Sequence, residues 1–262
     1  MRYSVAILAA LLLSASALKS VDAAIYAPDA FISGDFALGP TSPGKWGPPT
    51  MGTGATVTWS LMGSGFALAG EPGGHGGMPS LALSSFMPLG FKTAIESAFA
   101  AWSAVADITF VEVADPVVDW LAAGASASDI RITGAKFDGA GSTLAHGYYP
   151  PANGGPAAGD IHFDYDETWV LGFPGSGFDI FQVAAHEIGH AIGLDHTGVS
   201  ASLMNPFYTE AFSGPQADDI AGAVHIYGAP VSEVPEPTTF VIWSLAGGLG
   251  LVLRARRRRN PA

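Results

Sequence analysis

Cysteine is absent from the 262 residues of the sequence. This absence excludes disulfide bonds, thiolate metal ligands and a cysteine nucleophile. Positive charge is almost as scarce between the two ends of the chain, because residues 24–232 contain four Lys or Arg residues and 20 Asp or Glu residues, a net charge of −16. A surface of this sign repels nucleic acid, so we expect no nucleic-acid partner. It also offers many oxygen ligands for hard cations such as calcium.

The N-terminal end lacks a hydrophobic run of membrane-spanning length. Arg2 precedes the apolar run AILAALLL (6–13), and small residues follow up to position 23. This order is typical of a signal peptide, so we expect residues 1–23 to direct secretion and to be removed. A transmembrane helix is the alternative, but it needs about 20 apolar residues. Residues 24–53 are rich in glycine and proline and predict an irregular N-terminal segment.

The C-terminal tail, residues 231–262, combines three features in a fixed order. Pro-Glu-Pro (235–237) precedes an uncharged apolar segment (238–253), and five arginines follow that segment. This order resembles the PEP-CTERM sorting signal of bacteria that make exopolysaccharide. The resemblance implies an exosortase-type sorting enzyme as a partner and a transmembrane helix at 238–253. That helix would anchor the chain transiently in the inner membrane before its release into the extracellular or exopolysaccharide matrix.

A plain tail anchor is the alternative for this tail. As a helix, the apolar segment reaches about 24 Å, which is just under the ~30 Å hydrocarbon core of a bilayer. The arginines are expected to stay on the cytoplasmic side of the membrane.

Between the two ends, the hydrophobic pattern predicts one folded domain at residues 54–230. Apolar residues at helical spacing predict a helix at 91–105, and further helices are expected at 178–192 and 213–228. Ser213 and Gln216 have capping-box spacing at the start of the last of these helices. Short alternating or apolar runs predict strands at 55–61, 108–113, 129–132, 142–149 and 160–164. The mixture indicates an α+β fold.

The stretch AHEIGHAIGLDH (185–196) concentrates three histidines on a predicted helix and the turn after it. His186 and His190 are four residues apart, so they lie on the same helix face and can bind one ion. Gly193 tolerates the left-handed conformation that ends helices, so the chain can turn back and present His196 to the same ion. Three neutral imidazoles form an open zinc site that leaves a fourth position for water.

Glu187 is the candidate catalytic residue of this motif. Zinc lowers the pKa of bound water to near 7, and a general base must then accept the proton of that water. Glu187 follows His186 directly, so its side chain lies beside the ion without binding it, the position of the base in an HExxH site. The chemistry this predicts is amide hydrolysis. A structural helix that carries histidines by chance is the alternative.

HEIGHAIGLDH and the following SLMNP (202–206) resemble the metzincins and, within them, the matrixins. FKTAIESAFAAWSAVADITFVEV and GPQADDIAGAVHIYG resemble other segments of the same family, in the same order. The resemblance implies a zincin-like catalytic domain with a twisted, mixed five-stranded sheet and three main helices. It further implies a methionine turn at Met204, a polypeptide substrate that pairs with the edge strand at 142–146, and a pocket lined by Pro206 and Tyr208.

Further metal sites are implied only by this resemblance. FDGAGSTLAH and GDIHFDYDETW resemble metal-binding loops of the family, so the resemblance implies calcium as a second cofactor. The matching calcium ligands are Asp138, Gly139, Gly141, Thr143, Asp164 and Glu167. An acidic, solvated loop is the alternative for these residues. Asp129 and Asp160 match part of a second calcium site.

Two features depart from the matrixin pattern. His146 and His162 match two ligands of a structural zinc, but the His-x-Asp pair that would complete the site is absent, so we expect that zinc to be lost. A site completed by another group is the alternative. The family's cysteine-bearing pro-segment cannot exist here.

The resemblance also implies a supporting role for one acidic residue of the last helix. Asp218 or Asp219 is implied to hold the methionine turn or the N-terminus by hydrogen bonds.

The sequence therefore predicts a secreted zinc metalloendopeptidase with one catalytic zinc and Glu187 as general base. A non-catalytic extracellular matrix or surface binding module on the same scaffold is the alternative. Glu187 argues against it, because a protein that does not catalyse has no chemical reason to keep this carboxylate beside three ligands.

Overall fold

Five strands form one mixed sheet in the computed structural model, which describes residues 44–68, 77–151 and 155–231. In spatial order the strands are β2 (Ile108–Glu112), β1 (Ala55–Leu61), β3 (Ile130–Ala135), β5 (Ile161–Asp164) and β4 (Ala145–Gly147). β1 is parallel to β2 and β3, and β3 is parallel to β5. β4 runs antiparallel to β5 and forms one edge of the sheet.

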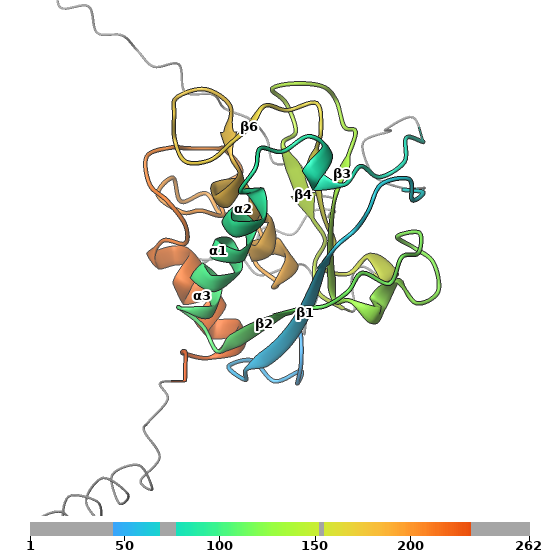
Figure 1. Cartoon of the computed structure of the whole chain (residues 1–262). Coiled ribbons are helices and arrows are strands. Elements are labelled where there is room, and N and C mark those ends of the chain that lie inside the picture. The colour runs from blue at the N-terminus through green and yellow to red at the C-terminus, as the bar shows by residue number, and fades with distance from the viewer. Residues whose placement is uncertain (1–43, 69–76, 152–154, 232–262) are drawn as a thin grey trace, which may run out of the picture. The chain divides into compact units, whose positions relative to one another are not determined.

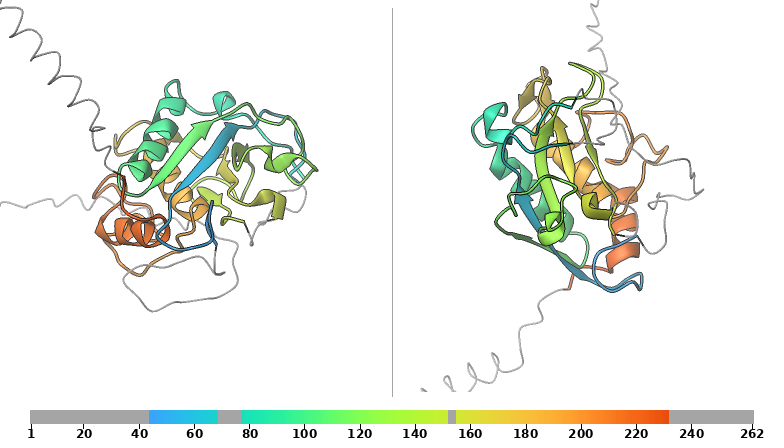
Figure 2. Two further views of the ribbon diagram at one scale, coloured as in Figure 1. Left: turned by 90° about the horizontal axis from the view of Figure 1, so that it is seen from below. Right: turned by 90° about the vertical axis from the view of Figure 1, so that its right-hand side faces the viewer.

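Three helices lie on one side of this sheet (Figures 1 and 2). They are α1 (Phe91–Ser103), α2 (Ile180–Ala191) and α3 (Ala217–Tyr227). α1 and α2 pack directly on each other, and the Trp102 indole N–H of α1 donates to the Ala185 carbonyl of α2 at 2.9 Å. The expected α+β fold, with a mixed five-stranded sheet and three main helices, is confirmed.

The centre of the sheet is covered on both faces. All six residues of β3 are buried, as expected of a central strand in a largely parallel sheet. The helices contribute Ile95, Phe99, Trp102 and Ile188 to the same core. Outside the main sheet, β6 (Trp169–Val170) and β7 (Phe178–Asp179) form a small parallel pair. Single-turn 3-10 helices lie at Leu83–Ser85, Ala125–Ala127 and Gly155–Ala157.

The helix that carries the histidine motif begins two residues later than the sequence predicts. Phe178 and Asp179 belong to β7, and Asp179 is the N-cap of α2. Its carboxylate accepts a hydrogen bond from the Gln182 N–H at 3.0 Å, which satisfies one of the free donors at the helix start.

The predicted start of the last helix at Ser213 is wrong. Gly214 has φ +70°, and Pro215 disfavours helical geometry at the residue before it, so the helix cannot form there. α3 begins at Ala217 instead, and the capping box joins Gln216 to Asp219.

The predicted strands differ from the structure mainly in length. The strand expected at 129–132 extends to Ala135, whereas the strand expected at 142–149 is reduced to Ala145–Gly147. Residues before this shorter strand belong to a loop in which Thr143 donates to the carboxylate of Asp138. Hydrogen bonds of this kind compete with the ladder of a sheet.

Trp46 attaches the N-terminal segment to the motif helix. Its indole N–H donates to the Ala191 carbonyl at 2.7 Å, and its backbone N–H donates to the Tyr227 hydroxyl at 3.2 Å. The Tyr227 hydroxyl in turn donates to the Ile192 carbonyl at 2.9 Å. These bonds satisfy two carbonyls at the C-terminal end of α2.

The described fold forms one unit that ends at Pro230. No helix in this described part is both long and apolar enough to cross a membrane. Three expected segments lie outside the described residues. They are the signal peptide (1–23), the beginning of the N-terminal segment (24–43) and the transmembrane helix (238–253).

Candidate active site

The structure brings the three histidines of the motif together. His186 Nε2 lies 3.1 Å from His190 Nε2 and 3.2 Å from His196 Nε2. Among the described residues, these three form the one group of three or more His, Cys, Asp or Glu side chains whose ligand atoms all lie within 4.8 Å of one another. In a tetrahedral zinc site, Zn–N distances of about 2.0–2.1 Å place the ligand nitrogens roughly 3.3–3.4 Å apart. The spacing of the triad therefore fits zinc.

Hydrogen bonds on the far side of two rings fix which nitrogen faces the centre. His186 Nδ1 lies 2.7 Å from the Leu203 carbonyl, and His190 Nδ1 lies 2.7 Å from the Leu194 carbonyl. A carbonyl only accepts, so both Nδ1 atoms must donate, and the Nε2 atom of each neutral ring keeps a free lone pair. The inward nitrogens of His186 and His190 are thus two acceptors in close contact, which is unfavourable unless a cation lies between them.

Burial keeps these rings neutral. It lowers the pKa of His186 to about 4 and, with a contribution from His186, the pKa of His196 to about 2. Burial, together with the neighbouring histidines, also holds the pKa of His190 well below its ordinary value of 6.5. Neutral imidazole is the form that binds a metal ion.

Glu187 is fully buried beside the triad. Neither of its carboxylate oxygens makes a hydrogen bond of normal geometry. Burial raises the pKa of Glu187 to about 8, and the backbone of Gly147 offsets only part of this effect. A buried carboxyl group without a firm partner is costly, so such groups cluster at functional sites.

The methionine turn lies against the motif helix as the resemblance implies. Met204 is buried, and a Cβ atom at Gly189 would lie 2.3 Å from its sulfur, so a larger residue at that point of α2 would require the Met204 side chain to shift. Asp219 holds the turn, because its carboxylate accepts hydrogen bonds from the Leu203 and Met204 N–H groups at 2.7 and 3.0 Å. Of the two acidic candidates on the last helix, Asp219 therefore has the supporting role.

A pocket opens beside His186 and Glu187. Pro206 and Tyr208 line it, where the resemblance places them. The Tyr208 hydroxyl accepts a hydrogen bond from the Asp179 N–H at 3.0 Å, so its ring is fixed in the wall. The remaining lining residues include Leu144, Gln182, Val183 and Leu203.

The proposed calcium ligands lie in one loop region but do not form a tight cluster. Asp138 accepts hydrogen bonds from the N–H and hydroxyl of Thr143, and Glu167 accepts one from the Gly141 N–H. Asp164 is fully buried, its Oδ2 atom has no hydrogen-bond partner, and burial raises its pKa. The side-chain oxygens of Asp138, Asp164 and Glu167 do not meet within 4.8 Å.

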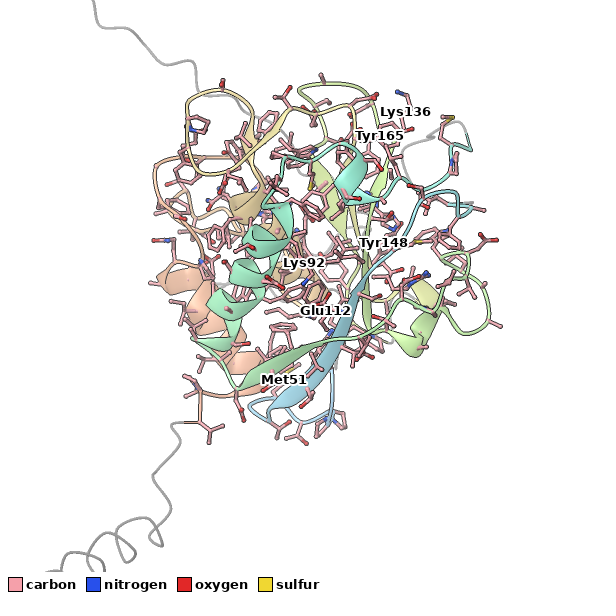
Figure 3. All side chains as sticks on the ribbon, viewed as in Figure 1. Met51, Lys92, Glu112, Lys136, Tyr148 and Tyr165 are labelled. Carbon is pink, nitrogen blue, oxygen red and sulfur yellow. The ribbon has the colours of Figure 1, made fainter. Side chains whose placement is uncertain are left out.

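Lys136 and Tyr165 lie near this loop. Lys136 forms an ion pair with Asp166, and its Nζ atom lies 5.7 Å from the centre of the Tyr165 ring (Figure 3). The ammonium group of Lys136 therefore lies close to the acidic loop, but Lys136 is not one of the proposed calcium ligands.

The residues that match other family metal sites have different surroundings. The Asp129 carboxylate accepts hydrogen bonds from the N–H and hydroxyl of Thr58, both at 2.8 Å. Asp160 accepts a hydrogen bond from the Arg131 N–H at 2.9 Å. His146 and His162 face each other across β4 and β5 with ring centres 5.3 Å apart.

Aromatic rings surround these two histidines. Phe137 stacks on His146 at 4.6 Å, and Trp120 lies 5.2 Å from His162. Tyr148 packs edge-on against both rings at 5.3 and 5.9 Å.

Sequence reasoning missed the partners that orient the motif. The carbonyls of Leu203 and Leu194 carry no motif signal, because backbone groups are present at every position. The indole of Trp46 carries none because it is 145 residues from the carbonyl to which it donates. Tyr149 was also missed, although its hydroxyl donates to Asp195 at 2.7 Å.

A helix-borne histidine pair, a third histidine after a glycine turn and a methionine turn against the helix, built on a mixed five-stranded sheet, define the metzincin class of zinc metallopeptidase folds. The sequence model of the family described as Matrixin matches residues 84–228, more than half of the chain. The chain belongs to the matrixin family, whose members are zinc metalloendopeptidases.

Curated relatives agree with this assignment. The chain is similar to karilysin of Tannerella forsythia, with 38% identity over 170 residues that cover 60% of this chain and 34% of karilysin. Stromelysin-3 of Xenopus laevis is 40% identical over 156 residues, covering 56% of this chain and 30% of that protein. Matrix metalloproteinase-16 of Homo sapiens is 43% identical over 161 residues, which cover 56% of this chain and 25% of that protein. The match thus spans a quarter to a third of the length of these relatives.

Proposed function

We propose that this chain is a secreted zinc endopeptidase that hydrolyses internal peptide bonds of polypeptides. The observation that carries the proposal is the set of three histidines in which the Nε2 atom of His186 lies 3.1 Å from that of His190 and 3.2 Å from that of His196, with the buried carboxyl group of Glu187 beside them.

Each residue of the site has a role in this proposal. His186, His190 and His196 hold zinc. When bound, zinc supplies Lewis-acid chemistry that polarises the carbonyl of the cleaved bond and makes water more acidic. Glu187 accepts the proton of the attacking water and passes it to the nitrogen of the leaving amine. A carboxyl group with a raised pKa suits both halves of this transfer, since it can hold the proton and release it near neutral pH.

The edge strand and the pocket suit an extended polypeptide. β4 is an edge of the sheet, so a substrate strand can add to it through backbone hydrogen bonds. Leu144, just before β4, also lines the pocket next to His186. A substrate strand on β4 would therefore pass the histidines, and the side chain after the cleaved bond would enter the pocket between Val183 and Pro206.

The test is hydrolysis of a generic unfolded protein by the purified chain. We expect cleavage that a zinc chelator abolishes and added zinc restores. A zinc-loaded chain that binds the unfolded protein without cutting it would overturn the proposal and support the binding-module alternative.

We further propose that calcium binds the loop of Asp138, Gly139, Gly141, Thr143, Asp164 and Glu167. Support comes from Asp164, a fully buried carboxylate with a free oxygen, and from Glu167, whose pKa burial raises. A cation with oxygen ligands would offset the cost of burying Asp164 and Glu167.

The sequence also supports a proposal for location. Residues 1–23 would direct secretion, and residues 231–262 would be recognised by an exosortase-type enzyme. The enzyme would then be anchored transiently in the inner membrane and act in the extracellular matrix.

A further inference from the structure

His196 differs from the other two histidines because no helix carries it. His186 and His190 lie on α2, whose regular geometry sets their separation. His196 follows the turn at Gly193, which has φ +107°, and lies in an irregular segment. Contacts outside the helix must therefore fix its backbone.

Two contacts hold the chain on either side of this ring. On one side, Asp195 Oδ1 accepts a hydrogen bond from the His196 N–H at 2.7 Å. On the other side, the Thr197 N–H donates to the Met204 carbonyl at 3.0 Å, which joins the segment to the methionine turn.

Tyr149 fixes the Asp195 carboxylate. Its hydroxyl donates to the same Oδ1 atom at 2.7 Å, so one oxygen joins Tyr149 to the backbone of His196. The Tyr149 side chain is only 4% exposed, and its ring lies edge-on to His190 with centres 5.9 Å apart. A buried aromatic ring packed in this way has little freedom to move.

Tyr149 lies two residues after the edge strand β4. This strand crosses α2 closely, since a Cβ atom at Gly147 would lie 2.6 Å from the Glu187 carbonyl and 3.2 Å from the His190 Cβ. The end of the edge strand and the third histidine are therefore joined through one hydroxyl and one carboxylate.

We propose that Tyr149 and Asp195 form a positioning pair that holds His196 in ligand geometry and joins the metal centre to the edge strand. The proposal rests on the proposed function in one respect, namely that His196 binds the metal. Neither side chain touches metal or substrate, so both act through the backbone of His196.

The first experiment measures zinc affinity by chelator competition in the full chain. Tyr149→Phe removes the hydroxyl and keeps the ring, and we expect zinc affinity to fall roughly tenfold, the low end of the range for groups that orient a ligand. Tyr148→Phe is the matched control, because it removes a hydroxyl from the adjacent residue, whose ring packs against His162. We expect the control to stay within about twofold of the unaltered chain.

A second measurement separates positioning from simple support of the fold. In the cobalt-substituted protein, the visible absorption bands should change in Tyr149→Phe and not in Tyr148→Phe. The melting temperature of the metal-free protein should change little. An equal fall in melting temperature with and without metal, with the cobalt bands unchanged, would show that Tyr149 only supports the fold.

The pair is tested by combining variants. Asp195→Ala should weaken zinc binding about as much as Tyr149→Phe, and Asp195→Asn, which keeps an acceptor oxygen, should restore most of the affinity. The double variant Tyr149→Phe/Asp195→Ala should bind zinc no more weakly than Asp195→Ala alone, because both changes break the same connection. Additive losses would overturn the proposal. A chain that shows this pattern but cleaves no polypeptide would refute the proposed function and leave the positioning pair intact.

Discussion

At the scale of single residues, the site depends on where each imidazole places its proton. The carbonyls of Leu203 and Leu194 hold the protons of two rings on the outer nitrogens, so the inner nitrogens face one another as acceptors. Glu187 adds a carboxyl group that burial makes a weaker acid. Burying the three histidines and Glu187 therefore costs folding free energy.

Glu187→Ala should leave zinc bound and remove the proton acceptor. We expect kcat to fall by about 10²–10⁴-fold, the typical contribution of a general base. Steady-state kinetics and metal analysis of the same preparation measure both quantities. Glu96→Ala, a change at an exposed glutamate of α1 that pairs with Lys92, is the control and should keep full activity. Near-normal hydrolysis by a zinc-loaded Glu187→Ala variant would exclude this role.

Gly189→Ala should destabilise the protein even though alanine favours helices. Helix propensity favours alanine by about 1 kcal/mol, whereas overpacking a filled core costs about 1–3 kcal/mol. The new Cβ would lie 2.3 Å from the buried Met204 sulfur and 3.2 Å from the Trp102 ring, so the clash should dominate, with a net loss of up to about 2 kcal/mol.

Denaturant unfolding at constant metal concentration measures this loss. Gly198→Ala is the matched control, because a Cβ atom there meets nothing within 4 Å. Equal stability of the two variants would mean that Met204 can move aside at no cost.

At the scale of elements, α3 stabilises a site that it does not line. Asp219 accepts hydrogen bonds from the turn residues Ser202, Leu203 and Met204 and from Gln216 at the start of its own helix. Leu203 then orients His186 through its carbonyl. The last helix is therefore joined to the metal ligand through the methionine turn.

Asp219→Ala should break this connection. Several buried donors would lose their acceptor, each at a cost of about 1–3 kcal/mol, so we expect a loss of roughly 3–5 kcal/mol in unfolding free energy and weaker zinc binding. Asp218→Ala, one residue away and less buried, should cost less than about 1 kcal/mol. The melting temperature of Asp219→Ala should therefore be clearly lower than that of Asp218→Ala. Equal melting temperatures of the two variants would contradict the role of Asp219.

The sequence predicted the elements whose pattern is local. The apolar spacing of 91–105 identified α1, and the histidine spacing identified the His186–His190 pair, because both follow from the turn of a helix. The ends of elements were less predictable. The start of α3 depended on Gly214 and Pro215, and the length of β4 depended on the hydrogen bonds of Asp138.

Long-range contacts were beyond the reach of any local pattern. Trp46 is 145 residues from the carbonyl to which it donates, and Tyr149 is 46 residues from Asp195. Such contacts arise only when the topology brings the segments together. Asp195 is part of the histidine motif, yet nothing in the sequence indicated that Tyr149 would be its hydrogen-bond partner.

At the scale of the whole molecule, we predict one tightly bound zinc per chain. His146 and His162 are surrounded by the rings of Phe137, Trp120 and Tyr148, and no third His, Cys, Asp or Glu side chain among the described residues joins them in a ligand group. Metal analysis of the purified protein measures the number of zinc ions per chain. Two zinc ions at full occupancy would contradict it.

Calcium should raise the melting temperature of the same protein. The expected ligands Asp138, Asp164 and Glu167 repel one another, and a bound cation removes that repulsion. Thermal unfolding with calcium and with a calcium-selective chelator measures the difference. Asp138→Asn should reduce the effect, and a melting temperature that does not respond to calcium would refute this site.

The tail gives a prediction about location. If a sorting enzyme removes it, protein in the extracellular matrix should lack the residues from about 237 onward. Mass spectrometry of the C-terminal peptide in cell and matrix fractions, with and without the sorting enzyme, makes this comparison. Matrix protein that still carries Arg254 to Arg259 would contradict removal and would leave the zinc chemistry unaffected.

The burial of Met204 has a consequence for oxidative damage. In a chain without cysteine, methionine is the side chain most open to oxidation, and the added oxygen turns it polar. Met78 is 47% exposed, whereas Met204 is 2% exposed and its sulfur lies against Gly189. Mild peroxide should therefore convert Met78 to the sulfoxide well before Met204. Oxidised Met204 in an ageing sample would then report that the fold around the metal had already opened.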